Sequence, residues 1–283
     1  MLVSRYGALH SNTMKTLPRF PVRRTWPFAV ALATIISGGA YALNDTGTTL
    51  CYTNATNPVA CSAAIRADSG SHPRQDSRFG RDANPSPGKV GGGAAGFDYT
   101  KISNAGNALP ANAALGTGPN DWACTRDNVT GLVWEVKTSN PGSPGLRDVS
   151  NSFTWYNPNA AANGGDAGST GNATSCNNTL PACNTQDYVI AVNAGNLCGR
   201  NDWRLPSYKD AFSIFNAQTL GAASPTPFDP TYFLVRGNAM YTSNTLLAQP
   251  NTVWYLESTG WNFTSKSSAP RQVRLVAGTN VYQ

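Results

Sequence analysis

The chain has 283 residues, of which 40% are hydrophobic and 13% charged, and its formal net charge is +6. This hydrophobic fraction supports a packed core and excludes a wholly disordered or collagen-like chain. The length suits one large domain or two small ones.

Residues 1–42 have the three parts of a secretory signal peptide. Basic residues without any acid come first, followed by an apolar run over 28–36 and the small residues of Ala40-Tyr41-Ala42. The run is shorter than the ~20 residues that span a bilayer, so no transmembrane segment is expected after cleavage. An uncleaved amphipathic anchor is the alternative. Met1 and Met14 both remain open as the start of translation.

The positive charge belongs mostly to this segment. Five of the 21 cations and none of the 15 acidic residues fall within it, so the rest of the chain carries +1. A nucleic-acid partner requires a basic patch, and none is expected here.

Histidine and glutamate are also scarce. A zinc site or a Ser-His-Asp triad would need His72, which lies in a polar stretch, and no motif pairs Glu135 with Glu257. We therefore expect no catalytic residue, metal site or cofactor.

Six cysteines follow the signal peptide, an even number that in an oxidising compartment predicts disulfides. Six cysteines allow 15 connectivities, and the sequence does not choose among them. Short loops favour three pairs: Cys51 with Cys61, Cys176 with Cys183, and by remainder Cys124 with Cys198.

Residues 43–120 are rich in glycine, asparagine and proline and show no sustained helical period. We predict turns and short strands that pack on a main domain over residues 121–283. The stretch 91–96 formally matches the dinucleotide-binding pattern G-x-G-x-x-G. No strand precedes it, so a turn is the better interpretation.

Within 121–283 the pattern predicts strands at 131–136, 253–257 and 272–276. A long polar loop is expected over 157–183, and a helix through Leu197 after a cap at Asn184. Ser207 and Asp210 predict a capping box for a second helix, with Ala211, Phe212 and Phe215 facing inward. Two helices with later strands favour an α+β fold.

Four segments together resemble one family, the Lcl C-terminal domain family. The resemblance covers about residues 121–276 and rests on D-N-x-T-G-L-x-W and D-W-R-L-P-[TS] above all. In this chain they are Trp122–Glu135, Cys198–Ser207, Tyr241–Ser243 and Val273–Val276. Arg78–Asp82 and Gly96–Ile102 also look like segments that precede such domains, which would make a single continuous unit.

The resemblance implies a C-type-lectin-like mixed fold with two helices and short, mainly antiparallel strands, distantly related to formylglycine-generating enzymes. The family is named after an exported, collagen-like bacterial adhesin that engages sulfated glycosaminoglycans. This chain has no Gly-X-Y tract. It also lacks the calcium signatures of sugar-binding C-type lectins, because Trp261-Asn262 is followed by Phe263, so a calcium ion has no support.

We expect Trp134, Trp203, Arg204 and Pro206 to build the fold, with Arg204 in a buried ion pair with Asp121 or Asp127. Aromatic side chains on loops can instead stack on sugars or anchor a protein partner. The candidates for ligand binding are Trp155, Tyr156, Tyr241, Trp261 and Arg236. Trp254-Tyr255 belongs to the same group, and Lys266 and Arg271 could meet sulfate or carboxylate groups.

The sequence thus predicts an exported, non-catalytic binding domain in the periplasm, on the outer surface or outside the cell. Its expected partner is a carbohydrate, including a sulfated one, or a surface protein. One alternative is an enzyme of the formylglycine-generating fold, which needs a free or redox-active cysteine. The other is a structural subunit of a surface assembly. The sequence does not give the oligomeric state.

Overall fold

The structure is a computed structural model, and it describes residues 44–53, 58–61, 75–85, 88–220, 227–234, 240–257 and 259–279. The predicted signal peptide and Arg236 lie outside these ranges. Residues Tyr41–Gln283 form one compact unit. Within the described ranges, every helix is too short or too polar to span a lipid bilayer.

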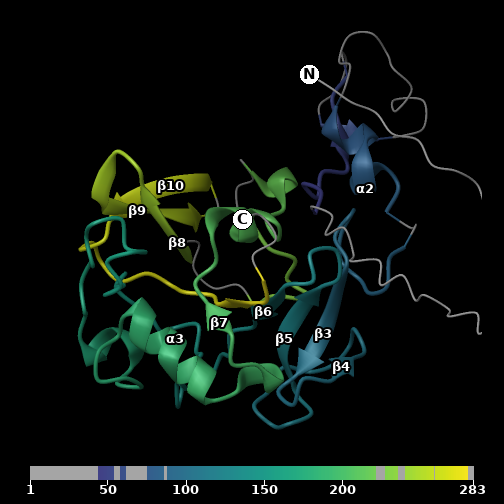
Figure 1. The fold of residues 1–283 in the computed structure, drawn as a ribbon. Coiled ribbons are helices and arrows are strands. Elements are labelled where there is room, and N and C mark those ends of the chain that lie inside the picture. The colour runs from purple at the N-terminus through teal and green to yellow at the C-terminus, as the bar shows by residue number, and fades with distance from the viewer. Residues whose placement is uncertain are drawn as a thin grey trace, which may run out of the picture. The chain divides into compact units, whose positions relative to one another are not determined.

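The largest sheet has six strands in the order β4-β3-β5-β6-β11-β7, each pair antiparallel (Figure 1). The strands are β3 (Tyr99–Ser103), β4 (Ala108–Leu109), β5 (Trp122–Asp127), β6 (Val133–Glu135), β7 (Trp203–Arg204) and β11 (Val276–Ala277). The predicted strand 131–136 is confirmed as β6, but only Val276 of the predicted strand 272–276 is in a strand. β5 was not predicted, whereas β3 falls in the segment 43–120, where short strands were predicted without bounds.

A second, three-stranded sheet has the order β10-β9-β8, also antiparallel (Figure 1). Its strands are β8 (Met240–Leu246), β9 (Gln249–Glu257) and β10 (Gly260–Ser265). β9 contains the predicted strand 253–257. Successive side chains of a strand point to opposite faces. Val253 and Tyr255 accordingly join one core cluster, and Leu256 joins another.

Both predicted helices are present and shorter than predicted. α3 (Thr185–Ala194) begins after Asn184, whose side chain accepts from the N–H of Asp187, and it ends at Gly195. α4 (Tyr208–Phe212) has the predicted capping box of Ser207 and Asp210. Ala211 and Phe215 are buried, but the Phe212 side chain is 44% exposed, so the inward prediction for Phe212 was wrong. One turn of helix is too short to bury both of its faces.

The remaining elements are short. They are β1 (Leu50–Cys51), β2 (Val59–Ala60), α2 (Gly80–Ala83) and four 3-10 turns: η1 (Asp76–Arg78), η2 (Ala173–Cys176), η3 (Leu197–Gly199) and η4 (Ala217–Thr219). With few helices, antiparallel sheets and three disulfides, the fold mixes α and β structure as predicted.

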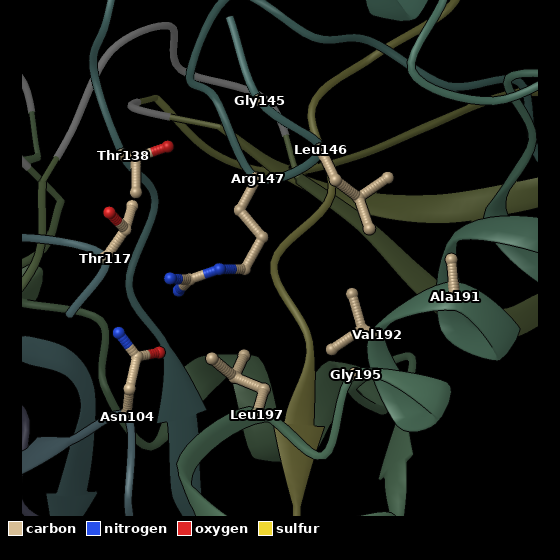
Figure 2. Close-up of a pocket in the computed structure, with 10 residues that line it drawn as sticks. All are labelled: Asn104, Thr117, Thr138, Gly145, Leu146, Arg147, Ala191, Val192, Gly195 and Leu197. Atoms are coloured by element: carbon tan, nitrogen blue, oxygen red, sulfur yellow. The ribbon is translucent and has the colours of Figure 1, made fainter. Parts of the chain in front are cut away.

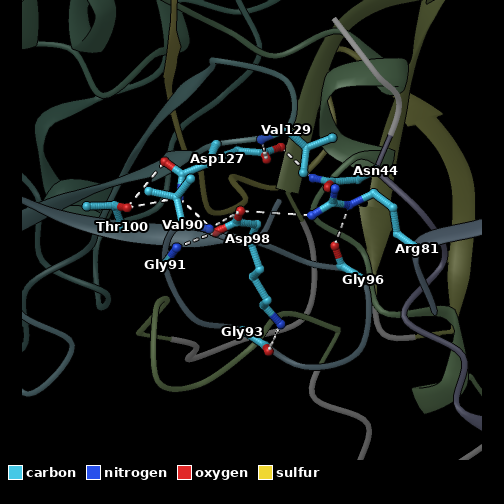
Figure 3. Close-up of polar contacts among 12 residues, drawn as sticks. Asn44, Arg81, Val90, Gly91, Gly93, Gly96, Asp98, Thr100, Asp127 and Val129 are labelled. Carbon is cyan, nitrogen blue, oxygen red and sulfur yellow. Dashed lines mark hydrogen bonds and ion pairs between the residues drawn. The ribbon is translucent and has the colours of Figure 1, made fainter. Parts of the chain in front are cut away.

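The segment before residue 121 is joined to the rest by strand pairing and by polar contacts. β3 pairs with β5 from Tyr99 opposite Asp127 onward, so a boundary at residue 120 falls inside a sheet. Figure 3 shows the neighbouring network: Asp98 accepts from the backbone N–H groups of Val90 and Gly91 and from Asn128. Arg81 lies 3.9 Å from the same carboxylate.

Three disulfides join Cys51 to Cys61, Cys124 to Cys198, and Cys176 to Cys183. These are the pairs that loop lengths favour, and they leave no free cysteine. The second connects β5 to η3 across 74 residues, and the third closes seven residues inside the long loop. The Cys124–Cys198 bond thus holds the turn that follows α3 against the six-stranded sheet.

Candidate functional site

The motif D-N-x-T-G-L-x-W forms the tight turn between β5 and β6. The Asp127 carboxylate accepts from the N–H of Val129 at 3.0 Å and from the hydroxyl of Thr130 at 2.6 Å. Gly131 has a φ of +76°, a conformation that favours glycine. Trp134, at the end of the motif, is fully buried. The motif therefore builds a turn and supplies a core side chain.

The motif D-W-R-L-P-S enters α4. Trp203 is 2% exposed and donates through its indole N–H to the carbonyl of Leu197 at 3.1 Å; Pro206 is also buried. Arg204 pairs with Asp210 at 2.7 Å, and not with Asp121 or Asp127 as expected. The reason is local: the capping box of α4 brings the Asp210 carboxylate beside β7.

Two of the predicted ligand-binding side chains are in the core. Trp155 and Tyr241 are each 0% exposed, and the Trp155 indole donates to the carbonyl of Thr242 at 2.9 Å. Because no face of either ring reaches solvent, these two assignments were wrong. Both rings lie in the cluster on the Val253 face of the three-stranded sheet.

The long loop 157–183 covers part of that region. The Lys266 ammonium lies 4.3 Å from the centre of the Trp155 ring and donates to the carbonyls of Asn163 and Asp166. Lys266 is only 1% exposed, so it is not a surface contact for sulfate. Tyr156 is half-buried beside this loop. Arg271 is half-buried and lies over the ring of Tyr255 at 4.0 Å.

Trp261, in contrast, takes part in an exposed group of rings that we call the aromatic surface. Trp254 of β9 and Trp261 and Phe263 of β10 share the Leu256 face of the three-stranded sheet, because Trp261 pairs with Leu256 and Phe263 with Trp254. Tyr208 and Phe212 of α4 contribute from the neighbouring helix. Tyr208, Phe212 and Phe263 are 43%, 44% and 52% exposed.

The rings of the aromatic surface contact one another at angles that leave parts of their faces open. Tyr208 meets Trp261 edge to face with ring centres 6.0 Å apart, and Phe263 meets Trp254 in the same way at 5.9 Å. Phe212 lies 6.3 Å from Trp261. Tyr208, Trp254 and Trp261 line a pocket of about 420 Å³. Such a volume is within the range of small-ligand sites.

Two polar contacts border the elements that carry these rings. The Asn262 side chain, between Trp261 and Phe263 in sequence, donates to the Glu257 carboxylate at 3.1 Å. Asn244 accepts from the N–H of Tyr208 at 2.8 Å and so anchors the start of α4 beside β8. Both Asn262 and Glu257 retain exposed surface. Because Asn262 alternates with Trp261 and Phe263 along β10, and Glu257 with Leu256 along β9, both of these polar side chains lie on the opposite face of the sheet from the rings.

Sequence reasoning identified Trp261 and, more loosely, Trp254, but it missed Tyr208, Phe212 and Phe263. Two signals were available. Tyr208 and Phe212 are four residues apart, which puts them on one face of a helix. Trp261 and Phe263 are two apart, which puts them on one face of a strand.

An acidic cluster lies elsewhere, in the segment before β3. Carboxylate oxygens of Asp45, Asp76 and Asp82 lie within 4.8 Å of one another. The Asp82 carboxylate accepts from the N–H groups of Thr48 and Gly96, at 2.9 and 2.8 Å. Burial raises the pKa of Asp82. These bonds give the cluster a structural role in tying the segment together.

The comparisons with known proteins give one match. The sequence model of the Lcl C-terminal domain matches residues 123–277. No curated protein and no solved structure matches the chain. The matched range spans β5 to β11, and it contains both motifs and the aromatic surface.

Proposed function

The chain belongs to the Lcl C-terminal domain family, and from this we propose that it is an exported, non-catalytic binding protein whose aromatic surface holds the sugar rings of a glycan. The observation that carries the proposal is the pocket between Tyr208, Trp254 and Trp261. A C-type-lectin-like arrangement of the fold is part of the same proposal.

The chemistry of the pocket suits a sugar. A pyranose ring has an apolar face of C–H groups and an edge of hydroxyls, so it packs against an indole or phenol ring and bonds to polar groups beside it. Trp254 and Trp261 supply the rings, and Tyr208, which also lines the pocket, supplies a hydroxyl group. The described lining carries no cation. We therefore place neutral glycans ahead of sulfated ones.

The disulfides support the exported setting. Proteins in oxidising compartments keep such bonds, whereas cytosolic thiols are mostly reduced. The enzyme alternative needs a reactive thiol, and each of the six sulfurs here is paired. The observations thus favour binding over thiol chemistry.

The test is a glycan array with the disulfide-bonded protein, the variants Trp254→Ala and Trp261→Ala, and a matched control. Phe79→Ala is that control, since Phe79 is 55% exposed and does not line the pocket. We expect the wild type and Phe79→Ala to bind the same glycans. Each tryptophan variant should lose at least tenfold in affinity, about 1.4 kcal/mol.

Melting temperatures of all four proteins show whether each variant is folded. Unchanged glycan binding by folded Trp254→Ala and Trp261→Ala would contradict the proposal. An empty array together with capture of a protein partner that depends on the same two tryptophans would replace the glycan with a protein ligand.

A further inference from the structure

A second pocket, of about 380 Å³, lies between the segment after β6 and the C-terminal half of α3 (Figure 2). Its two sides differ in polarity. Thr117 and Thr138 lie on one side, and Leu146, Val192 and Leu197 lie on the other, with the Arg147 side chain reaching in between them.

The Arg147 guanidinium is held in place by one of its nitrogens. Nη1 donates to the carbonyls of Ala123 and Val136, at 3.2 and 2.9 Å. Nε and Nη2 have no acceptor among the described residues, and neither do the hydroxyls of Thr117 and Thr138. The fixed guanidinium thus presents an unused pair of N–H donors, the geometry that matches a carboxylate.

The charges behind the pocket favour an anion. Lys137 lies 2.9 Å from the Glu135 carboxylate, and Arg274 donates to the Glu135 carbonyl at 2.6 Å; all three are buried. With Arg147, the group holds three cations and one carboxylate. Burial, with help from the charges of Arg274 and Arg147, lowers the pKa of Lys137 to about 8 against the opposing pull of Glu135.

A second buried carboxylate lies next to Arg147 in the chain. Asp148, which follows Arg147 in the chain, accepts from the N–H groups of Asn140 and Ser150, at 2.7 and 2.9 Å, and from the Ser150 hydroxyl. Asp148 still carries its negative charge, so with it the group holds three cations and two carboxylates, an excess of one positive charge. An anion bound against Arg147 would be partly shielded from water by the pocket walls, and there the attraction is stronger than in bulk water.

We propose that this pocket binds a carboxylate that carries a branched aliphatic group of about the size of a leucine side chain. The carboxylate lies against Nε and Nη2 of Arg147 and the threonine hydroxyls. The aliphatic group packs against Leu146, Val192 and Leu197. A free ammonium group beside the carboxylate is disfavoured by the same positive charges. The ligand is therefore a simple branched carboxylate or the C-terminal residue of a peptide.

The test is calorimetric titration of the disulfide-bonded protein with four probes: N-acetyl-leucine, N-acetyl-leucinamide, leucine and isovalerate. We expect saturable binding of N-acetyl-leucine and isovalerate. Binding of leucine should be weaker, and the amide, which lacks the carboxylate, should not bind. A peptide with a C-terminal leucine separates the two sources, because a peptide ligand should bind more tightly than isovalerate.

Three variants locate the site. Arg147→Met and Thr138→Val remove polar groups from the pocket, and Arg126→Met removes an exposed arginine that does not line it. We expect about a tenfold loss or more for Arg147→Met, a smaller loss for Thr138→Val, and none for Arg126→Met. If Arg147→Met fails to fold, Thr138→Val and Leu146→Asn carry the test. Equal binding of acid and amide, no saturable binding, or unchanged affinity in the folded pocket variants would overturn the proposal.

Discussion

Arg204 and Asp210 form an ion pair in which Arg204 Nη1 lies 2.7 Å from Asp210 Oδ2. The same carboxylate oxygen accepts from the N–H and the hydroxyl of Ser207, both at 2.8 Å. The pair thus joins β7 to the first turn of α4, the helix that carries Tyr208 to the aromatic surface. The ion pair therefore connects the D-W-R-L-P-S motif to the helix that contributes to the proposed site.

Removal of the Arg204 cation should destabilise the protein. Asp210 is completely buried, whereas the Arg204 side chain is 30% exposed. Arg204→Ala leaves a buried carboxylate without its cation, and we expect a loss of about 3 kcal/mol in the free energy of unfolding, measured by urea denaturation. The control is Arg200→Ala, which breaks an exposed pair with Asp202 and should cost at most about 1 kcal/mol. Equal losses of unfolding free energy in the two variants would show that burial of Asp210 does not strengthen its ion pair with Arg204.

Trp155 and Trp261 should respond to substitution in opposite ways. Trp155 fills the core, so Trp155→Ala should lower the free energy of unfolding by about 4 kcal/mol. Trp261 is partly exposed, so Trp261→Ala should lower the free energy of unfolding much less than Trp155→Ala does, while it abolishes ligand binding. Thermal unfolding and binding measured on both variants check this. If Trp155→Ala were as stable as the wild type but no longer bound the ligand, Trp155 would be a ligand-binding residue after all.

The long disulfide should contribute more stability than the short one. Cross-links restrict the unfolded chain more when they close longer loops. Replacing Cys124 and Cys198 together by alanine should cost about 4 kcal/mol, and replacing Cys176 and Cys183 about 2.5 kcal/mol. Denaturation of both double variants under the same non-reducing conditions measures the difference. A larger loss from the short bridge would indicate that local packing in the loop outweighs the chain entropy.

The Asp127 carboxyl should make stability depend on pH. Burial raises its pKa from 3.8 to about 6, although hydrogen bonds from Thr130, Val129 and Asn44 act in the opposite direction. Between these two values the folded protein binds more protons than the unfolded chain. The contribution of this group is therefore complete below about pH 4 and is lost as the pH rises through 6, a change of roughly 3 kcal/mol.

Asp127→Asn should remove this part of the pH dependence. The measurement is the free energy of unfolding of both proteins at several values between pH 4 and 7. Asp121→Asn, which removes an exposed carboxylate, should keep the wild-type slope. A difference between wild type and Asp127→Asn that is constant across this range would contradict the assignment.

The sequence by itself determined the features that depend on neighbours along the chain. The cap at Asn184 and the capping box of Ser207 and Asp210 both use contacts within three or four residues. The family motifs and the favoured cysteine pairs also follow from spacing. Local hydrogen bonds and short loops need no knowledge of the rest of the fold.

Only the tertiary structure decided which aromatic side chains reach solvent. Trp155 and Trp261 both looked suitable for a ligand, but the long loop and Lys266 cover the first. The second lies on the opposite face of the three-stranded sheet, where one turn of α4 leaves part of the surface open. Likewise, Arg204 pairs with Asp210 because of where α4 lies beside β7. Exposure and ion pairing depend on how distant segments pack, and no local pattern of residues contains that information.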